Sequence, residues 1–307
     1  MAKPLAVLTM IAALAASPAR AEAPRVAASI QPLHSLVAAV MRGVAEPALV
    51  VRGAASEHTY ALKPSDARML EQAQLVVLVD PHYEGFLAKP LERLAGRAEI
   101  VAMADLPGIS RLPQREGGVW EADEHGHGHD VHDGASFDGH LWLDPANAEV
   151  LVAAVAARLS ALDPAHAATY AANARTETER LRQLDASLKT KLASVQGQHY
   201  VVFHDAYQYF EYRYGLTPAG AITVDPERPP SARRLAELRD RLTRTGATCV
   251  FREPQFPAPV VETLAKAAGA RVGVLDPQGA TLPPGPDLYP ALMTGLADGL
   301  TSCLSGR

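Results

Sequence analysis

Cysteine is scarce in this sequence, and positive charge is not in excess. Of the 307 residues only two are cysteines, Cys249 and Cys303, and the formal net charge is −5. A single pair with no second pair nearby argues against a thiolate metal site, and in an oxidising compartment such a pair usually forms one disulfide. Two buried free thiols are the alternative. Without a basic cluster to neutralise phosphates, we do not expect the chain to bind nucleic acid.

Enzyme motifs and long apolar runs are also missing. The sequence has no His-Glu-x-x-His helix of a zinc protease and no Gly-x-Ser-x-Gly elbow of a serine hydrolase. After the N-terminus, no stretch reaches the roughly 18 uninterrupted apolar residues that a transmembrane helix needs. We therefore expect a soluble mature protein.

The N-terminus has the three parts of a secretory signal. Residues 1–21 contain Lys3, an apolar run from Leu5 to Ala16, and a small-x-small motif that ends at Ala21. This pattern predicts cleavage before Glu22. No cysteine follows the cleavage site to carry a lipid, so we expect the protein to be released into the periplasm.

The rest of the chain alternates β-rich runs with segments long enough for helices, which is typical of parallel sheets. The runs are Val26 to Ser29, Ala48 to Val51, Leu75 to Val79, Ile100 to Met103, Tyr200 to Phe203, Ala219 to Thr223, Cys249 to Arg252 and Val272 to Leu275. They predict an α/β fold with two lobes, 22–163 and 196–307, each a mainly parallel β-sheet flanked by helices.

One long helix is predicted to join the lobes. Asp163-Pro164 provides an N-cap followed by proline at the first helical position, and leucines then recur at three and four residues up to Val195. At 1.5 Å per residue, a helix over 164–195 would be on the order of 45 Å long. Such a helix would lie along both lobes and restrict their hinge motion.

A histidine-rich tract interrupts the first lobe at residues 121–133. Four histidines and five carboxylates crowd into these thirteen residues; the histidines are His125, His127, His129 and His132. With almost no apolar content, the tract cannot fold on a core of its own. We interpret it as an accessory metal-binding loop, with a solubilising loop as the alternative.

Three histidines outside the tract are candidate metal ligands. His58 follows the second β-rich run, and His204 ends the fifth. Asp276 likewise follows the last run. Because the carboxyl ends of parallel strands border the ligand crevice, we expect these three side chains to face one cleft between the lobes. His140 lies in His-Leu-Trp-Leu-Asp-Pro, and no strand clearly precedes it, so that rule does not place it.

Zinc suits this set of donors. It binds neutral imidazole nitrogens and prefers four ligands, so three histidines and a carboxylate or water would complete its shell. Manganese prefers more oxygen donors. The remaining histidines fit structural positions better: His34 belongs to an apolar stretch, and His166 and His199 suit the surface. His82 follows a β-rich run and could instead line the cleft.

A three-histidine zinc site is compatible with several functions. A zinc-dependent hydrolase would also use such a site, and Glu57 beside His58 could then act as a general base. A periplasmic zinc buffer or chaperone would have the same site chemistry. The residues alone do not separate these alternatives.

Several longer motifs resemble a known family, the zinc-binding proteins of bacterial high-affinity zinc ABC importers, called the ZnuA family. The resemblance extends over essentially the whole mature chain. Its motifs are Ser56 to Asp66, His140 to Pro145, Phe203 to Tyr207, Cys249 to Phe256 and Leu275 to Pro277.

This resemblance implies a periplasmic carrier rather than an enzyme. It implies Zn²⁺ bound by His58, His140 and His204 between two lobes, with Glu57 or water in the fourth place. Related manganese and zinc proteins use an aspartate where Asp276 stands, so a manganese-binding member is a further alternative. The partners implied are an ABC permease and its ATPase, and we expect a monomer. The histidine-rich tract and the cysteine pair match the family's zinc branch.

Overall fold

The computed structural model describes residues 22–306 except 95, 116–136, 225 and 227–228. The predicted signal peptide, 1–21, and the histidine-rich tract, 121–133, therefore lie outside the described residues. Those two predictions stay predictions.

Two four-stranded parallel sheets form the framework, with strand orders β2-β1-β3-β4 and β6-β5-β7-β8. The strands are β1 Val26–Ala28, β2 Ala48–Leu49, β3 Leu75–Leu78, β4 Glu99–Ala102, β5 His199–His204, β6 Thr217–Thr223, β7 Cys249–Arg252 and β8 Arg271–Val274. Each of the eight predicted runs overlaps one of them. Central strands such as β3 are apolar throughout and buried, because helices cover both faces of a parallel sheet. The predicted fold class is confirmed.

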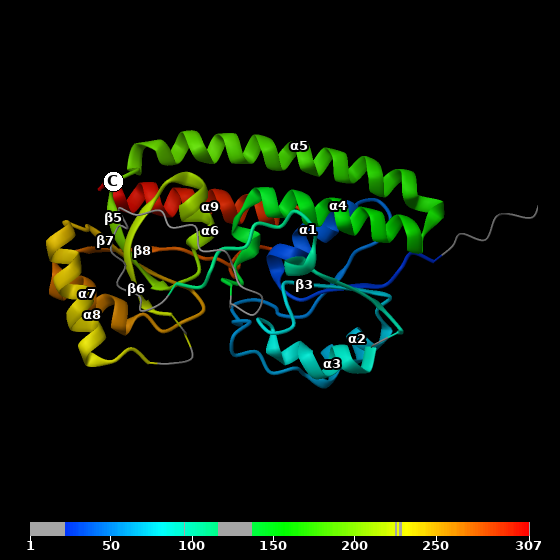
Figure 1. The fold of residues 1–307 in the computed structure, drawn as a ribbon, viewed down its shortest axis with the longest axis horizontal. Coiled ribbons are helices and arrows are strands. Elements are labelled where there is room, and N and C mark those ends of the chain that lie inside the picture. The colour runs from blue at the N-terminus through cyan, green and yellow to red at the C-terminus, as the bar shows by residue number, and fades with distance from the viewer. Residues whose placement is uncertain (1–21, 95, 116–136, 225, 227–228, 307) are drawn as a thin grey trace, which may run out of the picture.

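Helices cover the two sheets and lie between them (Figure 1). Several begin as their sequences indicate: the Asp144 side chain, for example, accepts a hydrogen bond from the backbone N–H of Ala146 and so caps α4. The helices are α1 Gln31–Met41, α2 Pro64–Gln72, α3 Ala88–Leu94, α4 Pro145–Leu162, α5 Ala167–Leu192, α6 Gln208–Tyr214, α7 Ala232–Thr245, α8 Pro259–Ala268 and α9 Leu288–Leu304.

The predicted linking helix is present. Helix α5 is preceded by a 3₁₀ turn, Pro164–His166, and followed by another, Ala193–Val195. It runs above both halves of the molecule, with α4 and α9 beneath it (Figure 1). A helix that packs on both halves limits how far they can move apart.

One hydrophobic core joins the two halves. Its buried side chains come from the first sheet, from α1, α4, α5 and α9, and from β5 and β7 of the second sheet. Hydrogen bonds also cross this boundary: for example, Trp142 Nε1 donates to the Pro277 carbonyl at 2.8 Å, and the Tyr289 backbone N–H donates to Ser35 Oγ at 2.9 Å. The lobes therefore share packing and are not two separate cores joined by a single helix.

Helix α4 is the one described helix that is long and apolar enough to cross a membrane by length and composition. It packs against α1 and α5, and its residues Leu151, Val155 and Leu159 are buried. We attribute its apolar character to this core position.

Candidate metal centre

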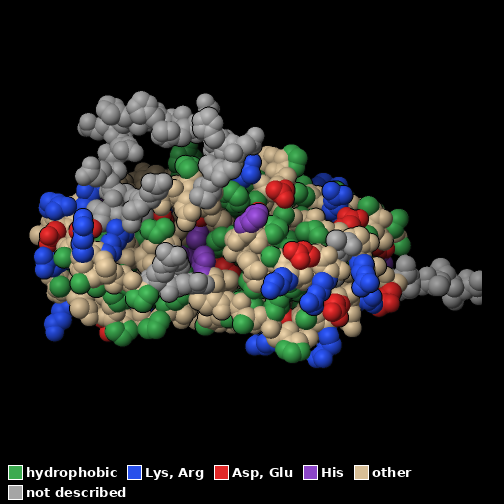
Figure 2. All heavy atoms as spheres, turned by 60° about the horizontal axis from the view of Figure 1, so that its bottom comes forward, with side chains coloured by type: hydrophobic (Ala, Val, Ile, Leu, Met, Phe, Trp, Pro, Cys, Tyr) green, Lys and Arg blue, Asp and Glu red, His purple; other side chains and the backbone are tan. Residues whose placement is uncertain are grey.

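The three predicted histidines meet between the two halves of the molecule. His58 lies on the loop between β2 and α2, His140 begins a 3₁₀ turn before α4, and His204 is the last residue of β5. One ligand nitrogen from each lies within 4.8 Å of the other two. Figure 2 shows histidine side chains in the hollow between the halves.

The spacing of these nitrogens fits one small cation. His140 Nε2 and His204 Nε2 are 3.1 Å apart, and the three ring centroids are 5.1 to 5.7 Å apart. Ligands at about 2.0 to 2.1 Å from a tetrahedral zinc lie about 3.3 Å from one another. The cluster is therefore close to the size that a four-coordinate zinc requires.

Buried carboxylates fix the orientation of two of the rings. His140 Nδ1 lies 2.6 Å from Asp138 Oδ1, and His204 Nδ1 lies 2.7 Å from Glu253 Oε2. A carboxylate accepts hydrogen bonds, so each Nδ1 carries the hydrogen and each Nε2 carries a lone pair. Two lone pairs that face each other at 3.1 Å repel unless a cation or a shared proton lies between them. Metal-binding histidines in proteins commonly have such carboxylate partners.

The His204 ring is sensitive to this environment. Burial lowers the pKa of His204, but the charge of Glu253 and its hydrogen bond outweigh burial and raise the pKa above the usual value. A proton and a metal ion thus compete for the same nitrogen.

Glu57 lies beside the cluster as a possible fourth donor. The residue is 4% exposed, and its Oε1 lies 3.6 Å from His58 Nε2 and accepts a hydrogen bond of 2.8 Å from the Tyr83 hydroxyl. Burial raises the pKa of Glu57. The charges of His58 and His140 and the hydrogen bond from Tyr83 have the opposite effect and outweigh burial, so the pKa of Glu57 lies below its usual value. An ionised carboxylate next to three imidazoles suits a divalent cation.

Asp276 is not part of the three-histidine group. Its Oδ1 accepts hydrogen bonds from Gln255 Nε2 at 2.7 Å and from the backbone N–H groups of Gln278 and Gly279 at 3.1 and 2.9 Å. Oδ1 thus organises the turn after β8. Asp276 stays the alternative fourth ligand. Glu57 also lies outside the group, but its Oε1 is 3.6 Å from His58 Nε2.

Four groups around the site were not predicted from the sequence: Asp138, Glu253, Tyr83 and Arg115. Glu253 directly follows β7, so the rule that placed His204 could also have found it. Asp138 two residues before His140 gave a weaker signal, because a carboxylate at that spacing also suits an ordinary turn.

Arg115 links the two lobes next to His204. Its guanidinium lies 2.8 Å from Asp205 and 2.6 Å from Glu211, both in the second lobe. Burial raises the pKa of Asp205 to about 7, although the Arg115 charge opposes the increase. Arg115 is the last described residue before 116–136.

The other described histidines lie outside the group. His34 is buried in α1, as expected, and its Nε2 donates to the Pro47 carbonyl at 3.0 Å. Burial lowers the pKa of His34. His82 is exposed, while His166 Nδ1 lies 2.7 Å from Asp163 Oδ2 at the start of the linking helix.

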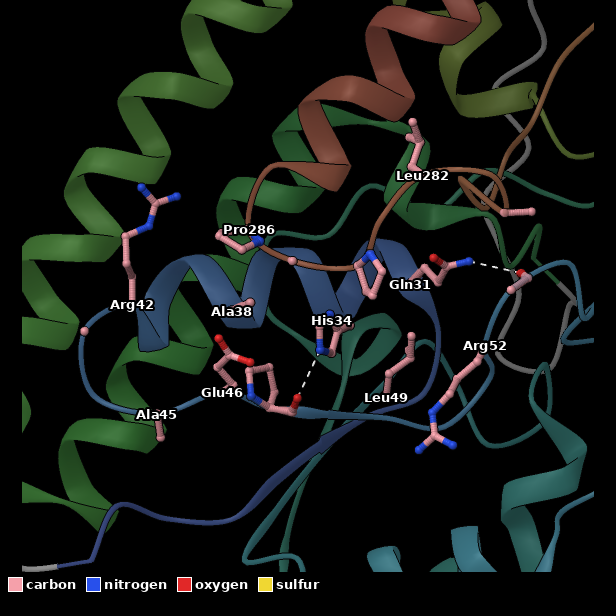
Figure 3. A pocket seen from close by; sticks show the side chains of 16 residues that line it. Gln31, His34, Ala38, Arg42, Ala45, Glu46, Leu49, Arg52, Leu282 and Pro286 are labelled. Carbon is pink, nitrogen blue, oxygen red and sulfur yellow. Dashed lines mark hydrogen bonds between the residues drawn. The ribbon is translucent and has the colours of Figure 1, made fainter.

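A cavity of about 540 Å³ lies elsewhere, between α1 and residues 280–286 (Figure 3). His34, Arg42 and Arg52 line it, with Arg42 and Arg52 on opposite sides. None of the three clustered histidines does. The candidate metal centre is identified by its donor atoms.

Cys249 and Cys303 form a disulfide, as predicted. It joins β7 to α9 across a sequence separation of 54 residues. Chain-entropy reasoning gives a stabilisation of about 4 kcal/mol for a loop of this length, as an upper value.

Comparison with known proteins gives the same picture. The sequence profile described as "Zinc-uptake complex component A periplasmic" (ZnuA) matches residues 26–303. High-affinity zinc uptake system proteins ZnuA from Brucella suis and Yersinia pestis are 44% and 38% identical; the alignments cover 91% and 95% of each chain, respectively. A crystal structure of ZnuA matches with a TM-score of 0.74 at 25% identity, over 91% of this chain and 99% of that one. Since the match includes both sheets, the linking helix and all three clustered histidines, this chain belongs to the ZnuA family.

Proposed function

We propose that this protein captures Zn²⁺ in the periplasm with His58, His140 and His204 and delivers it to the permease of an ABC-type zinc importer that its ATPase drives. The observation that carries the proposal is the pair of Nε2 atoms, 3.1 Å apart, whose rings are both anchored through Nδ1 by buried carboxylates. Zn²⁺ is the cargo, and the protein acts as a monomer.

The donor set favours zinc over manganese. Three imidazole nitrogens and one carboxylate or water match the shell of zinc, whereas manganese suits a site richer in oxygen. Asp138, Glu253 and Glu57 surround the three rings with negative charge, which offsets the cost of burying a dication. Glu57 or a water molecule completes the shell.

The family assignment bears on the alternatives. Its members are transport binding proteins and not enzymes, so the hydrolase alternative is set aside. The curated relatives carry the name of an uptake system, which favours delivery to an importer over simple buffering.

The test is a competition titration with a chromophoric chelator on the purified mature chain. We expect one tight site for Zn²⁺, much weaker binding of Mn²⁺, and loss of the tight site in His204→Ala. Equal affinity for Mn²⁺ would support the manganese alternative, and tight zinc binding by His204→Ala would overturn the site. Delivery is tested by the uptake of radioactive zinc into cells that lack the gene for this protein, compared with the same cells after the gene is restored.

A further inference from the structure

Tyr83 contacts more of the metal centre than any sequence signal indicated. Its ring packs edge-on against His58 and His140, with centroids 5.2 and 5.4 Å away, and against Trp142 at 6.1 Å. Its hydroxyl donates to Glu57 Oε1 at 2.8 Å. One side chain therefore supports two ligands and holds one oxygen of the candidate fourth.

Gly139 makes the position of this ring possible. A Cβ at residue 139 would lie 2.0 Å from Tyr83 Cδ2 and 2.5 Å from Cε2, far inside van der Waals contact. Gly139 does not adopt a positive φ, so alanine would fit its backbone conformation. The glycine before His140 is thus required for clearance of the Tyr83 ring and not for an unusual turn.

We propose that Tyr83 is a positioning residue that sets how Glu57 meets the metal and thereby favours zinc over manganese. The inference rests on the proposed function of the site. A phenol has one proton, and Tyr83 gives it to Oε1, the Glu57 oxygen that lies 3.6 Å from His58 Nε2. This hydrogen bond occupies one lone pair of Oε1 and fixes the orientation of the carboxylate, which opposes binding of a cation through both oxygens. Three nitrogens and one oxygen make the four-coordinate shell that zinc prefers, whereas a carboxylate free to bind through both oxygens would suit manganese.

The Tyr83 ring, which packs against Gly139, also restrains His58. The side chain of His58 is 19% exposed, more than those of the other two ligands. The Tyr83 ring packs against the His58 ring at an interplanar angle of 75°, and its hydroxyl lies 3.5 Å from His58 Nε2. A displaced ring would leave both His58 and Glu57 less restrained, so its loss should affect the geometry of the bound metal as well as its affinity.

The test measures Zn²⁺ and Mn²⁺ affinities and the visible spectrum of the Co²⁺-loaded protein for Tyr83→Phe. Loss of an outer-shell hydrogen bond costs about 10- to 100-fold in metal affinity. We expect zinc affinity to fall about tenfold and manganese affinity to fall less or to rise, so that the zinc-to-manganese ratio falls. The Co²⁺ bands should weaken, because their intensity decreases as the coordination number rises. Tyr170→Phe is the matched control, since it removes a tyrosine–carboxylate hydrogen bond of 2.9 Å to Asp163 in another part of the fold.

Two further variants isolate the mechanism. Gly139→Ala should also lower the zinc-to-manganese affinity ratio, because its Cβ would displace the Tyr83 ring. In a Tyr83→Ala background, Gly139→Ala should have no further effect on that ratio. Tyr83→Phe should likewise add nothing in a Glu57→Gln background, because the carboxylate that it restrains is gone.

Two results would overturn the inference: a ratio within twofold of wild type for Tyr83→Phe, or equal losses for both metals with an unchanged Co²⁺ spectrum, which would make Tyr83 a merely structural residue. Failure of the proposed function is a separate result, since it would appear as the absence of tight zinc binding in the wild-type chain.

Discussion

His140 and His204 differ from His58 in how firmly the fold holds them. The side chains of the first two are 6% and 3% exposed, and a buried carboxylate holds each ring through Nδ1. His58 lies on the loop between β2 and α2, where its side chain is 19% exposed beside Glu57 and Tyr83. The comparison divides the three proposed ligands into a fixed pair that spans the two lobes and a third that lies on a loop.

Removal of a proposed ligand should have the largest effect on zinc affinity, and it tests the difference between the fixed pair and His58 most directly. We expect His140→Ala and His204→Ala to weaken zinc binding by more than the 10- to 100-fold typical of outer-shell losses, and His58→Ala to weaken it less than either. Chelator competition measures the affinities, and circular dichroism checks that each variant is folded. Equal losses for all three variants would remove the distinction between the fixed pair and the loop.

Removal of the anchoring carboxylates should give the next largest effect. Asp138→Asn and Glu253→Gln keep the volume of the side chain but weaken the hydrogen bond to Nδ1, so zinc affinity should fall about 10- to 100-fold. Asp163→Asn is the matched control. Asp163 Oδ2 lies 2.7 Å from His166 Nδ1, in a part of the fold that does not contact the clustered histidines. If the control lost as much affinity as the other two, the anchors would not act on the metal specifically.

Acidification should weaken zinc binding through the fixed pair. Since the pKa of His204 in the zinc-free protein lies above its usual value near 6.5, a proton occupies this site at a higher pH than on an ordinary histidine. Affinity should therefore decrease as the pH falls from 7.5 to 5.5, by about tenfold per pH unit for each proton displaced. Calorimetry in buffers of different ionisation enthalpy counts the protons. A pH-independent affinity would contradict a histidine site.

Deletion of residues 121–133 should have the smallest effect on the tight site. A flexible tract must be ordered to bind zinc, at about 1 to 2 kcal/mol per fixed residue, so its affinity should be below that of a preformed site. Isothermal titration of the full and shortened chains should show one tight phase in both and a weaker phase in the full chain alone. Loss of the tight phase would place tract histidines in the primary site.

The sequence predicted the framework well because its signals are local. A reader of the sequence needs only neighbouring residues to recognise an apolar run, and such a run marks each of the eight strands. The same is true of Asp163-Pro164, which marks the start of the linking segment. The shared core was not predicted, because the apolar face of a helix such as α9 shows that it is buried but not which helices it packs against.

The site could be predicted in part for a similar reason. The strand-end rule places His204 on β5 and would also place Glu253 after β7, whereas His140 begins a 3₁₀ turn and needed the family resemblance. Tyr83 could not be found, because its position depends on the missing Cβ of Gly139, which is 56 residues away in the sequence. Such a contact exists only in the folded chain.

The most direct test of the account is anomalous diffraction at the zinc absorption edge from crystals of the mature chain grown with equimolar zinc. The account predicts one strong peak, about 2.0 to 2.1 Å from an imidazole nitrogen of each of His58, His140 and His204, with Glu57 or water as the fourth ligand. A principal peak among the histidines of the 121–133 tract, or one that lacks His140 or His204 as a ligand, would contradict it.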